Sequence, residues 1–277
     1  MTTIRPSRIA NHLFMIFFSL VMMYPVIWWV GASLKTAAEL SLPTLWPSVP
    51  QWSNYAEGWK FSKEFSFGHF FVNTLLMAGA NVVGGVLTAA VVAFGFARLH
   101  FPLRGFWFSV MLLTLMLPGQ VTIVPQYILY NAFGFVDSYV PLVLPHFLGG
   151  GAFFVFLLVQ FIRGIPRDLD EAAKIDGASV YGIFGRIVFP LVKPALVTVA
   201  IFTFIWSWDD FFAQLLYISS VEKFTVGLAL RMFIDQFEIA WGQLLAMSLL
   251  SVVPSVALFF LAQKHFVEGI ATTGLKG

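Results

Sequence analysis

The side chains that most often carry out catalysis or hold metals are scarce in this sequence and widely separated. Cysteine is absent, and the five histidines are His12, His69, His100, His146 and His265. Their spacing matches no metal-ligand pattern. The sequence has no G-x-x-x-x-G-K-[ST] phosphate loop, and no Ser/His/Asp arrangement stands out. It therefore predicts a protein that is not an enzyme and that holds no metal and no cofactor.

Two adjacent carboxylates, Asp209 and Asp210, lie inside a strongly apolar stretch. Ionisable groups in such a stretch are costly, so they are candidates for function. One hypothesis is that they line a path for a solute and accept hydrogen bonds from its hydroxyls. The alternative, which we favour, is that they cap or brace helices. Weaker candidates for the same path are the polar side chains of Asn73, Asn81, Gln120, Gln126, His146 and Gln214, each of which has the alternative of binding a neighbouring helix.

Composition places these residues in a membrane protein. The chain of 277 residues is 59% hydrophobic and 11% charged, and its mean hydropathy is +0.85. Soluble domains carry about 25% charged residues, so the bilayer is the expected solvent. A net charge of +2 gives no reason to expect a nucleic-acid partner. Six stretches are long enough to cross a bilayer at about 20 residues each: His12–Ser33, Phe70–Ala97, Phe106–Tyr127, Val140–Ile162, Leu191–Leu216 and Trp241–Gln263.

We therefore predict an all-α, polytopic membrane protein with six transmembrane helices. The first apolar run, Leu13–Val30, is too long for a typical signal peptide, so we interpret it as a retained span; the alternative is a cleaved signal. With six spans, eleven Lys and Arg residues fall on the side of the two termini and five on the other. The positive-inside rule then puts both termini in the cytoplasm.

The longest segment on the predicted cytoplasmic side, residues 163–190, has clear helix signals. Asp168, Asp170 and Glu171 place negative charge where a helix N-terminus favours it, after a proline at position 166 that suits the first turn. Gly177 suits a left-handed cap that ends this helix, and a second short helix can follow it. The two helices would lie along the membrane surface. They either present a knob to a partner protein or rest on the lipid headgroups.

The same segment resembles a family motif. Glu171-Ala172-Ala173, Asp176-Gly177-Ala178, Ile187 and Pro190 fall at the places of the "EAA loop" of ABC importer permeases. The stretches Ser33-Leu34-Lys35 and Trp208-Asp209-Asp210-Phe211-Phe212 are similar to maltose-type sugar permeases, and the likeness is greatest for the six-span partner of the permease pair. Two positions depart from the family pattern. In the second stretch Asp209 replaces the usual Asn, and in the C-terminal tail Ile270-Ala271 stands where Leu-Thr is common.

This resemblance implies one transmembrane domain over residues 1–277, with a core of about 66–265, a coupling loop at 163–190 and a cytoplasmic tail at 264–277. It implies a bacterial inner-membrane subunit that forms half of the path for a sugar or sugar-derived solute. The implied partners are a second, non-identical permease subunit, two ATP-binding subunits, an extracytoplasmic solute-binding protein and the lipid bilayer. The residues implied to couple to the ATPase are Glu171 as charged anchor, Gly177 as the turn, Ala172, Ala173 and Ala178 as points of close approach, and Asp176, Ile187 and Pro190 beside them.

The main alternative is an autonomous secondary transporter or channel. Such proteins often have inverted repeats and broken helices near the midplane of the bilayer. The sequence shows neither clearly, although we expect Pro118 and Pro125 to kink the third span. Glycines at Gly79, Gly84, Gly85 and 149–151 predict close helix packing.

Overall fold

The computed structural model describes residues 6–60, 64–149, 151–234 and 239–274, with side chains described between residues 11 and 263. The chain divides into two compact units. Unit 1 comprises residues 1–69 and 229–253, and unit 2 comprises residues 70–228 and 254–277. Within the described ranges the regular structure is helical, apart from one isolated antiparallel bridge between Ile234 and Ile239. The predicted all-α class is confirmed.

Unit 1 contains α1 (Pro6–Ala32), α2 (Ala37–Leu40), α3 (Ser53–Lys60) and the first part of α15 (Trp241–Gly274). Its loops are held by the buried Asn54, whose Nδ2 donates to the carbonyl oxygens of Ser33 and Lys35 at 2.9 and 3.1 Å. Gly242 packs directly on this amide, since a Cβ there would lie 2.5 Å from Asn54 Oδ1. The expected tail at 264–277 begins inside α15, and residues 275–277 lie outside the described range.

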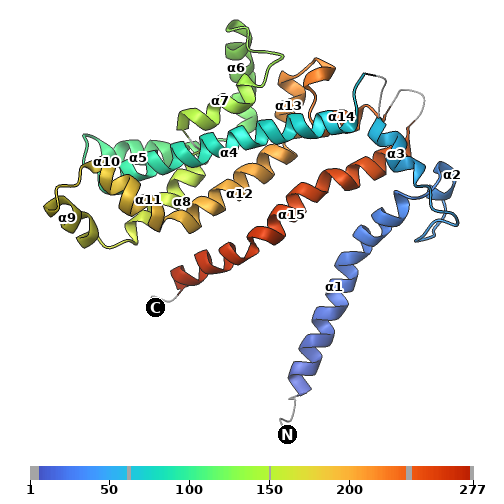
Figure 1. Cartoon of the computed structure of the whole chain (residues 1–277), viewed down its shortest axis with the longest axis horizontal. Coiled ribbons are helices and arrows are strands. Elements are labelled where there is room, and N and C mark those ends of the chain that lie inside the picture. The colour runs from blue at the N-terminus through green and yellow to red at the C-terminus, as the bar shows by residue number, and fades with distance from the viewer. Residues whose placement is uncertain (1–5, 61–63, 150, 235–238, 275–277) are drawn as a thin grey trace. The chain divides into compact units, whose positions relative to one another are not determined.

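Unit 2 holds most of the remaining helices (Figure 1). They are α4 (Phe67–Arg98), α5 (Arg104–Thr114), α6 (Gly119–Ala132), α7 (Val140–Gly149), α8 (Ala152–Arg163), α9 (Asp168–Ile175), α10 (Val180–Ile183), a π-helix (Phe184–Val188), α11 (Phe189–Leu191), α12 (Lys193–Asp209), α13 (Phe211–Tyr217), a 3-10 turn (Val221–Lys223) and α14 (Val226–Arg231). The start of α4 and the end of α14 belong to unit 1.

The core of unit 2 forms where α4, α8 and α12 meet. Alanines of α4 at positions 89, 90, 93 and 97 pack against Val155, Leu158 and Ile162 of α8 and against Val199 of α12. Small side chains let helix backbones approach closely. The expected close packing is confirmed at Gly84, where a Cβ would lie 2.5 Å from the ring of Phe147, and is wrong at Gly79 and Gly149, where a Cβ would meet none of the described atoms within 4 Å; position 150 lies outside the described residues.

Four helical segments are long and apolar enough to cross a membrane: Asn11–Ala32, Phe67–Arg98, Val140–Arg163 and Trp241–Gln263. They match four of the six predicted stretches. The other two are pairs of helices bent by 99° between α5 and α6 and by 74° before α12, so the described chain has up to six spans. The sequence does not show these two bends clearly, although it predicts a kink at Pro118.

The first bend has a local cause. Pro118 lies at the N-cap of α6, where the first bend occurs, whereas Pro125 sits inside the continuous α6. Only the first of the two expected kinks is therefore a break. The predicted run Leu191–Leu216 is also interrupted, because α12 ends at Asp209 and α13 begins at Phe211.

Candidate functional site

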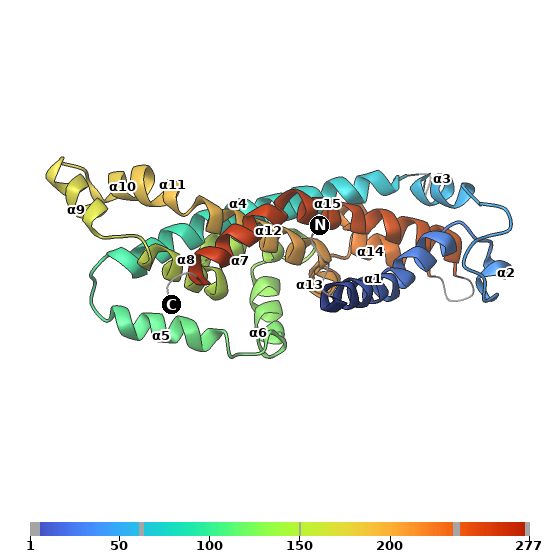
Figure 2. The same cartoon turned by 90° about the horizontal axis from the view of Figure 1, so that it is seen from below.

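The predicted pair of short helices is present at one end of unit 2, opposite α13 and α14 (Figures 1 and 2). α9 begins after Arg167, so the proline at position 166 precedes the helix and does not occupy its first turn. Gly177 follows α9 with φ +82°, the left-handed conformation that the sequence predicts. Ser179 then caps α10, because its Oγ accepts from Gly182 N at 3.2 Å.

α9 is tied to the end of α4 by a buried ion pair. Arg98 Nε lies 2.9 Å from Asp170 Oδ2, and the two side chains are only 4% and 10% exposed. Arg98 Nη2 also donates to Ile165 O at 2.9 Å, and Arg167 Nη2 donates to Ala97 O at 3.4 Å. The first turn of α9 is thus held at the last turn of α4. Sequence reasoning noted three acidic residues here and missed that one of them is buried.

An apolar layer reinforces this attachment. Ala173 and Ala178 are half-buried against the core of unit 2, as is Phe184 of the π-helix. The ring of Phe184 lies 5.1 Å from that of Phe94 on α4. Part of the surface of Ala173 and Ala178, which the resemblance assigns to close approach of a partner, is therefore taken up inside the chain.

The outer side of the two short helices is exposed and partly apolar. Ile175 and Tyr181 are 87% and 88% exposed. Around them lie Leu169, Glu171 and Ala172, which are also exposed; we call these five residues the tip surface. Of the other residues implied to couple to an ATPase, Asp176, Gly177 and Pro190 are exposed and Ile187 is half-buried.

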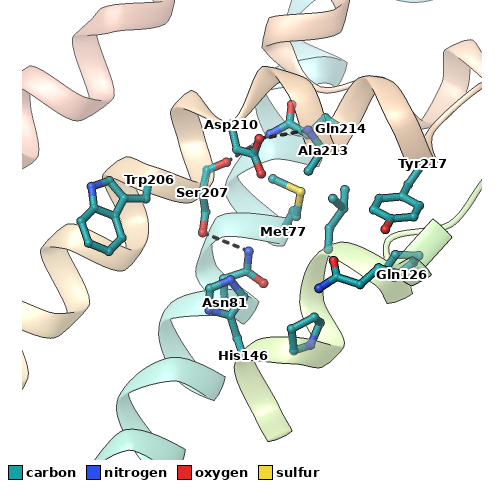
Figure 3. A pocket seen from close by; sticks show the side chains of 13 residues that line it. Met77, Asn81, Gln126, His146, Trp206, Ser207, Asp210, Ala213, Gln214 and Tyr217 are labelled. Carbon is teal, nitrogen blue, oxygen red and sulfur yellow. Dashed lines mark hydrogen bonds between the residues drawn. The ribbon is translucent and has the colours of Figure 1, made fainter. Parts of the chain in front are cut away.

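A second feature is a pocket of about 230 Å³ between α4, α6, α7, α12 and α13 (Figure 3). In Figure 3 Asn81 and Ser207 lie on one side of it, and Gln126 and Tyr217 lie on the other. The lining comprises Met77, Asn81, Gln126, Pro141, Leu142, Pro145, His146, Trp206, Ser207, Asp210, Ala213, Gln214 and Tyr217.

Beside Gln214 at 1% exposure, Asn81 is a deeply buried amide of this pocket at 3%. Its Nδ2 donates to Ser207 Oγ at 3.0 Å, which ties α4 to α12. Its Oδ1 is buried and has no hydrogen-bond partner, and the same holds for Thr203 Oγ1. Buried polar atoms in native proteins are nearly always satisfied, so the enclosed oxygen of Asn81, a pocket-lining residue, is a candidate acceptor for a donor that enters beside it.

The structure separates the eight sequence candidates for the solute path. Asp210 Oδ1 caps α13 by accepting from Ala213 N at 3.0 Å, and Asp210 also lines the pocket. Gln214 lines it too, but its amide is committed to Ser207 O and to the hydroxyl of Thr225. Three candidates do not line the pocket: Asp209, Gln120 and Asn73. Asp209 ends α12, and Gln120 is exposed on α6. Asn73 Nδ2 donates instead to Glu222 O and Phe224 O. The remaining three candidates, Asn81, Gln126 and His146, are in its lining.

At the end of unit 2 away from α9, Asp137 joins two loops. Its carboxylate accepts from the backbone N–H groups of Ser219 and Ser220 at 3.0 and 2.8 Å and from Lys223 Nζ at 3.2 Å. Hydrogen bonds from Ser220 and Ser219, and then from Lys223, hold the pKa of Asp137 far below its usual range. Sequence reasoning missed this residue, because nothing local marks a non-glycine residue with φ +60°.

Comparison with known proteins extends the resemblance. Residues 81–272 match the family model of the binding-protein-dependent transport system inner membrane component. The arabinooligosaccharides transport system permease protein AraQ of Bacillus subtilis is 30% identical over 98% of this chain and 96% of its own. The sn-glycerol-3-phosphate transport system permease protein UgpE of Yersinia enterocolitica is 33% identical over 96% of each chain.

A solved structure shares the fold. One chain of a bacterial ABC transporter that imports the acidic polysaccharide alginate aligns with a TM-score of 0.83 at 20% identity, over 96% of this chain and 100% of that one. The family is a class of transporter permeases, which is not an enzyme class. The chain belongs to the family of binding-protein-dependent transport system inner membrane components and is a permease subunit of an ABC importer.

Proposed function

We propose that this subunit forms half of the path for a sugar or sugar-derived solute across a bacterial inner membrane. Its partners in this proposal are a second, non-identical permease subunit, two ATP-binding subunits and an extracytoplasmic solute-binding protein. Relatives named for arabinooligosaccharides and for glycerol phosphate support the solute class. We propose one transmembrane domain with its core at about 66–265.

The tip surface is, in this proposal, the site where an ATP-binding subunit docks. The observation that carries it is the ion pair between Arg98 and Asp170, at 2.9 Å and almost fully buried. A helix held in this way cannot move independently of α4. Nucleotide-driven motion of a docked partner would therefore displace α9 and α4 together, which is a rigid-body switch.

The orientation follows from charge. If each bent helix pair crosses the membrane, the six spans leave both termini on one side. The loop that carries α9 lies on that same side, and eleven of the sixteen Lys and Arg residues lie there. The positive-inside rule makes it the cytoplasm, where ATP is available.

A second candidate function, an autonomous secondary transporter, has one observation in its favour. The two bent helix pairs are of the kind that secondary transporters use near their binding sites. It gives no role to the exposed apolar tip surface, which faces away from the core of unit 2.

The experiment is to co-express the chain with candidate ATP-binding and permease partners and to compare Glu171→Ala with Asp168→Ala. Both carboxylates are exposed on the first turn of α9, so the second variant is a matched control. We expect Glu171→Ala alone to reduce co-purification of the ATP-binding subunit and ATP-dependent uptake. Ion-driven uptake by the chain alone in liposomes would contradict the proposal.

A further inference from the structure

We infer that the pocket at Asn81 is a solute-contact site of this subunit and that it selects uncharged polyhydroxylated solutes over anionic ones. This inference rests on the proposed transport of a sugar-like solute. It adds that this subunit itself contacts the solute, and it names the charge class. The pocket lies wholly inside unit 2.

The polar groups of the pocket suit hydroxyl groups. Asn81 Oδ1 is a buried acceptor without a partner, and its side chain is fixed by the 3.0 Å hydrogen bond to Ser207. Gln126 and Tyr217 present an amide and a phenol on the other side (Figure 3). A hydroxyl both donates and accepts, so a polyol satisfies amide oxygens and amide N–H groups at the same time.

The remaining lining is apolar. Met77, Leu142 and Pro145 contribute side chains between the polar ones, and they suit the C–H faces of a sugar ring. The volume of about 230 Å³ is larger than the roughly 150 Å³ of a cavity that holds one benzene ring. Such a space takes one ring of a sugar at a time.

The charge of the lining argues against anions. The lining residues include Asp210 and neither lysine nor arginine. A carboxylate, phosphate or sulfonate in the pocket would face the Asp210 carboxylate with no fixed cation to offset the repulsion, and like charges at short range in a poorly solvated site are strongly unfavourable. A site for an anionic solute such as glycerol phosphate requires a fixed cation, and this lining has no lysine or arginine.

The test uses the membrane complex of this chain with its partner subunits in nanodiscs, without the solute-binding protein, so that only the membrane site contributes. Saturation-transfer NMR measures binding of matched probes: methyl hexosides and the corresponding methyl hexuronides, in the gluco and galacto series. The two members of each pair differ only in a hydroxymethyl group against a carboxylate. We expect transfer to a hexoside and none to its hexuronide.

Three variants in the pocket and one control outside it locate the site. Asn81→Leu and Gln126→Leu each remove hydrogen-bonding groups, and we expect about threefold to tenfold weaker hexoside binding from the loss of one neutral hydrogen bond. Asn131→Leu, an exposed asparagine of α6 outside the pocket, is the matched control and should have no effect. Asp210→Asn keeps a capping side chain, and it should admit the hexuronide.

The inference is overturned if hexuronides bind as well as hexosides, if no hexoside binds, or if Gln126→Leu and Asn81→Leu both bind like the parent complex. These outcomes are separable from failure of the proposed function. If the complex shows ATP-dependent uptake with its solute-binding protein but no hexoside binds to the pocket, only the inference is contradicted. A complex that shows no ATP-dependent uptake at all contradicts the function.

Discussion

Arg98 and Asp170 connect the last turn of α4 to the first turn of α9 across 2.9 Å, with both side chains withdrawn from solvent. Burying two charges is costly, and the cost is recovered only where geometry and further hydrogen bonds are good. Arg98 Nη2 adds one hydrogen bond, to Ile165 O, while Arg98 Nε and Asp170 Oδ1 are buried without a hydrogen-bond partner, so the pair depends on its close charge contact. The pair therefore fixes where α9 sits, and it is expected to break only when the loop detaches.

Removing one member of this pair is the first prediction. Asp170→Ala leaves the guanidinium of Arg98 buried and uncompensated, which costs about 3 kcal/mol of stability. The neighbouring exposed Asp168→Ala should change stability by less than about 0.5 kcal/mol, as surface substitutions do. Thermal unfolding in detergent measures both. Equal melting temperatures for the two variants would show that the ion pair does not hold α9.

The turn after α9 gives a second prediction. Gly177 has φ +82°, and a side chain in this conformation costs about 1 kcal/mol or more. Gly177→Ala should therefore shift the α9–α10 turn and lower the solute transported per ATP hydrolysed. Gly182→Ala is the control, because the added Cβ makes only ordinary contacts at 3.6 Å and beyond. An unchanged ratio in Gly177→Ala would mean that this turn does not set the position of α9.

The close packing of α4 on α7 gives a third prediction. A methyl group at Gly84 would lie 2.5 Å from the ring of Phe147, whereas one at Gly79 meets nothing within 4 Å among the described atoms. Gly84→Ala should destabilise the protein by about 1 to 3 kcal/mol through overpacking, and Gly79→Ala should not. Thermal unfolding of the isolated chain measures the stability of both variants. If Gly84→Ala leaves the stability unchanged, α7 moves away from α4 without an energetic cost, which contradicts this prediction.

Acid stability follows from Asp137. Its pKa is lowered in the folded state by hydrogen bonds from Ser220 and Ser219, so its contribution is fully present above the pKa of an unfolded aspartate, about 3.9. The contribution is lost as the pH falls from there through the lower folded pKa. Asp137→Asn should be less stable than the parent at neutral pH, and the difference should shrink below about pH 4. Melting curves against pH measure it, with Glu64→Gln as a control; a gap that is constant with pH would contradict this account.

The helical class and the α9–α10 pair follow from the sequence because apolar runs and capping residues are local signals. Gly177 is an example, since a glycine after a helix of eight residues needs only neighbouring residues to be interpreted. The bend at Pro118 was expected from the proline, whereas the 74° bend between Leu191 and Lys193 was missed because hydropathy averages over a window that includes both arms of a bent span.

The pairing partners are not local. Arg98 and Asp170 are 72 positions apart and Asn81 and Ser207 are 126 apart, so only the packing of α4 against the later helices brings them together. The pocket illustrates the same limit. Asp210 was singled out for its charge, whereas Asn81 became the stronger candidate only when its oxygen proved to be buried without a partner.

The central claim, that the tip surface docks an ATP-binding subunit in the cytoplasm, is open to one direct measurement. The chain has no cysteine, so Ile175→Cys and Tyr181→Cys, at the two most exposed positions of the tip surface, introduce a single thiol each. In intact cells we predict that neither thiol reacts with a membrane-impermeant maleimide and that both crosslink to the ATP-binding subunit. Labelling from outside, or crosslinks that never include that subunit, would contradict the account.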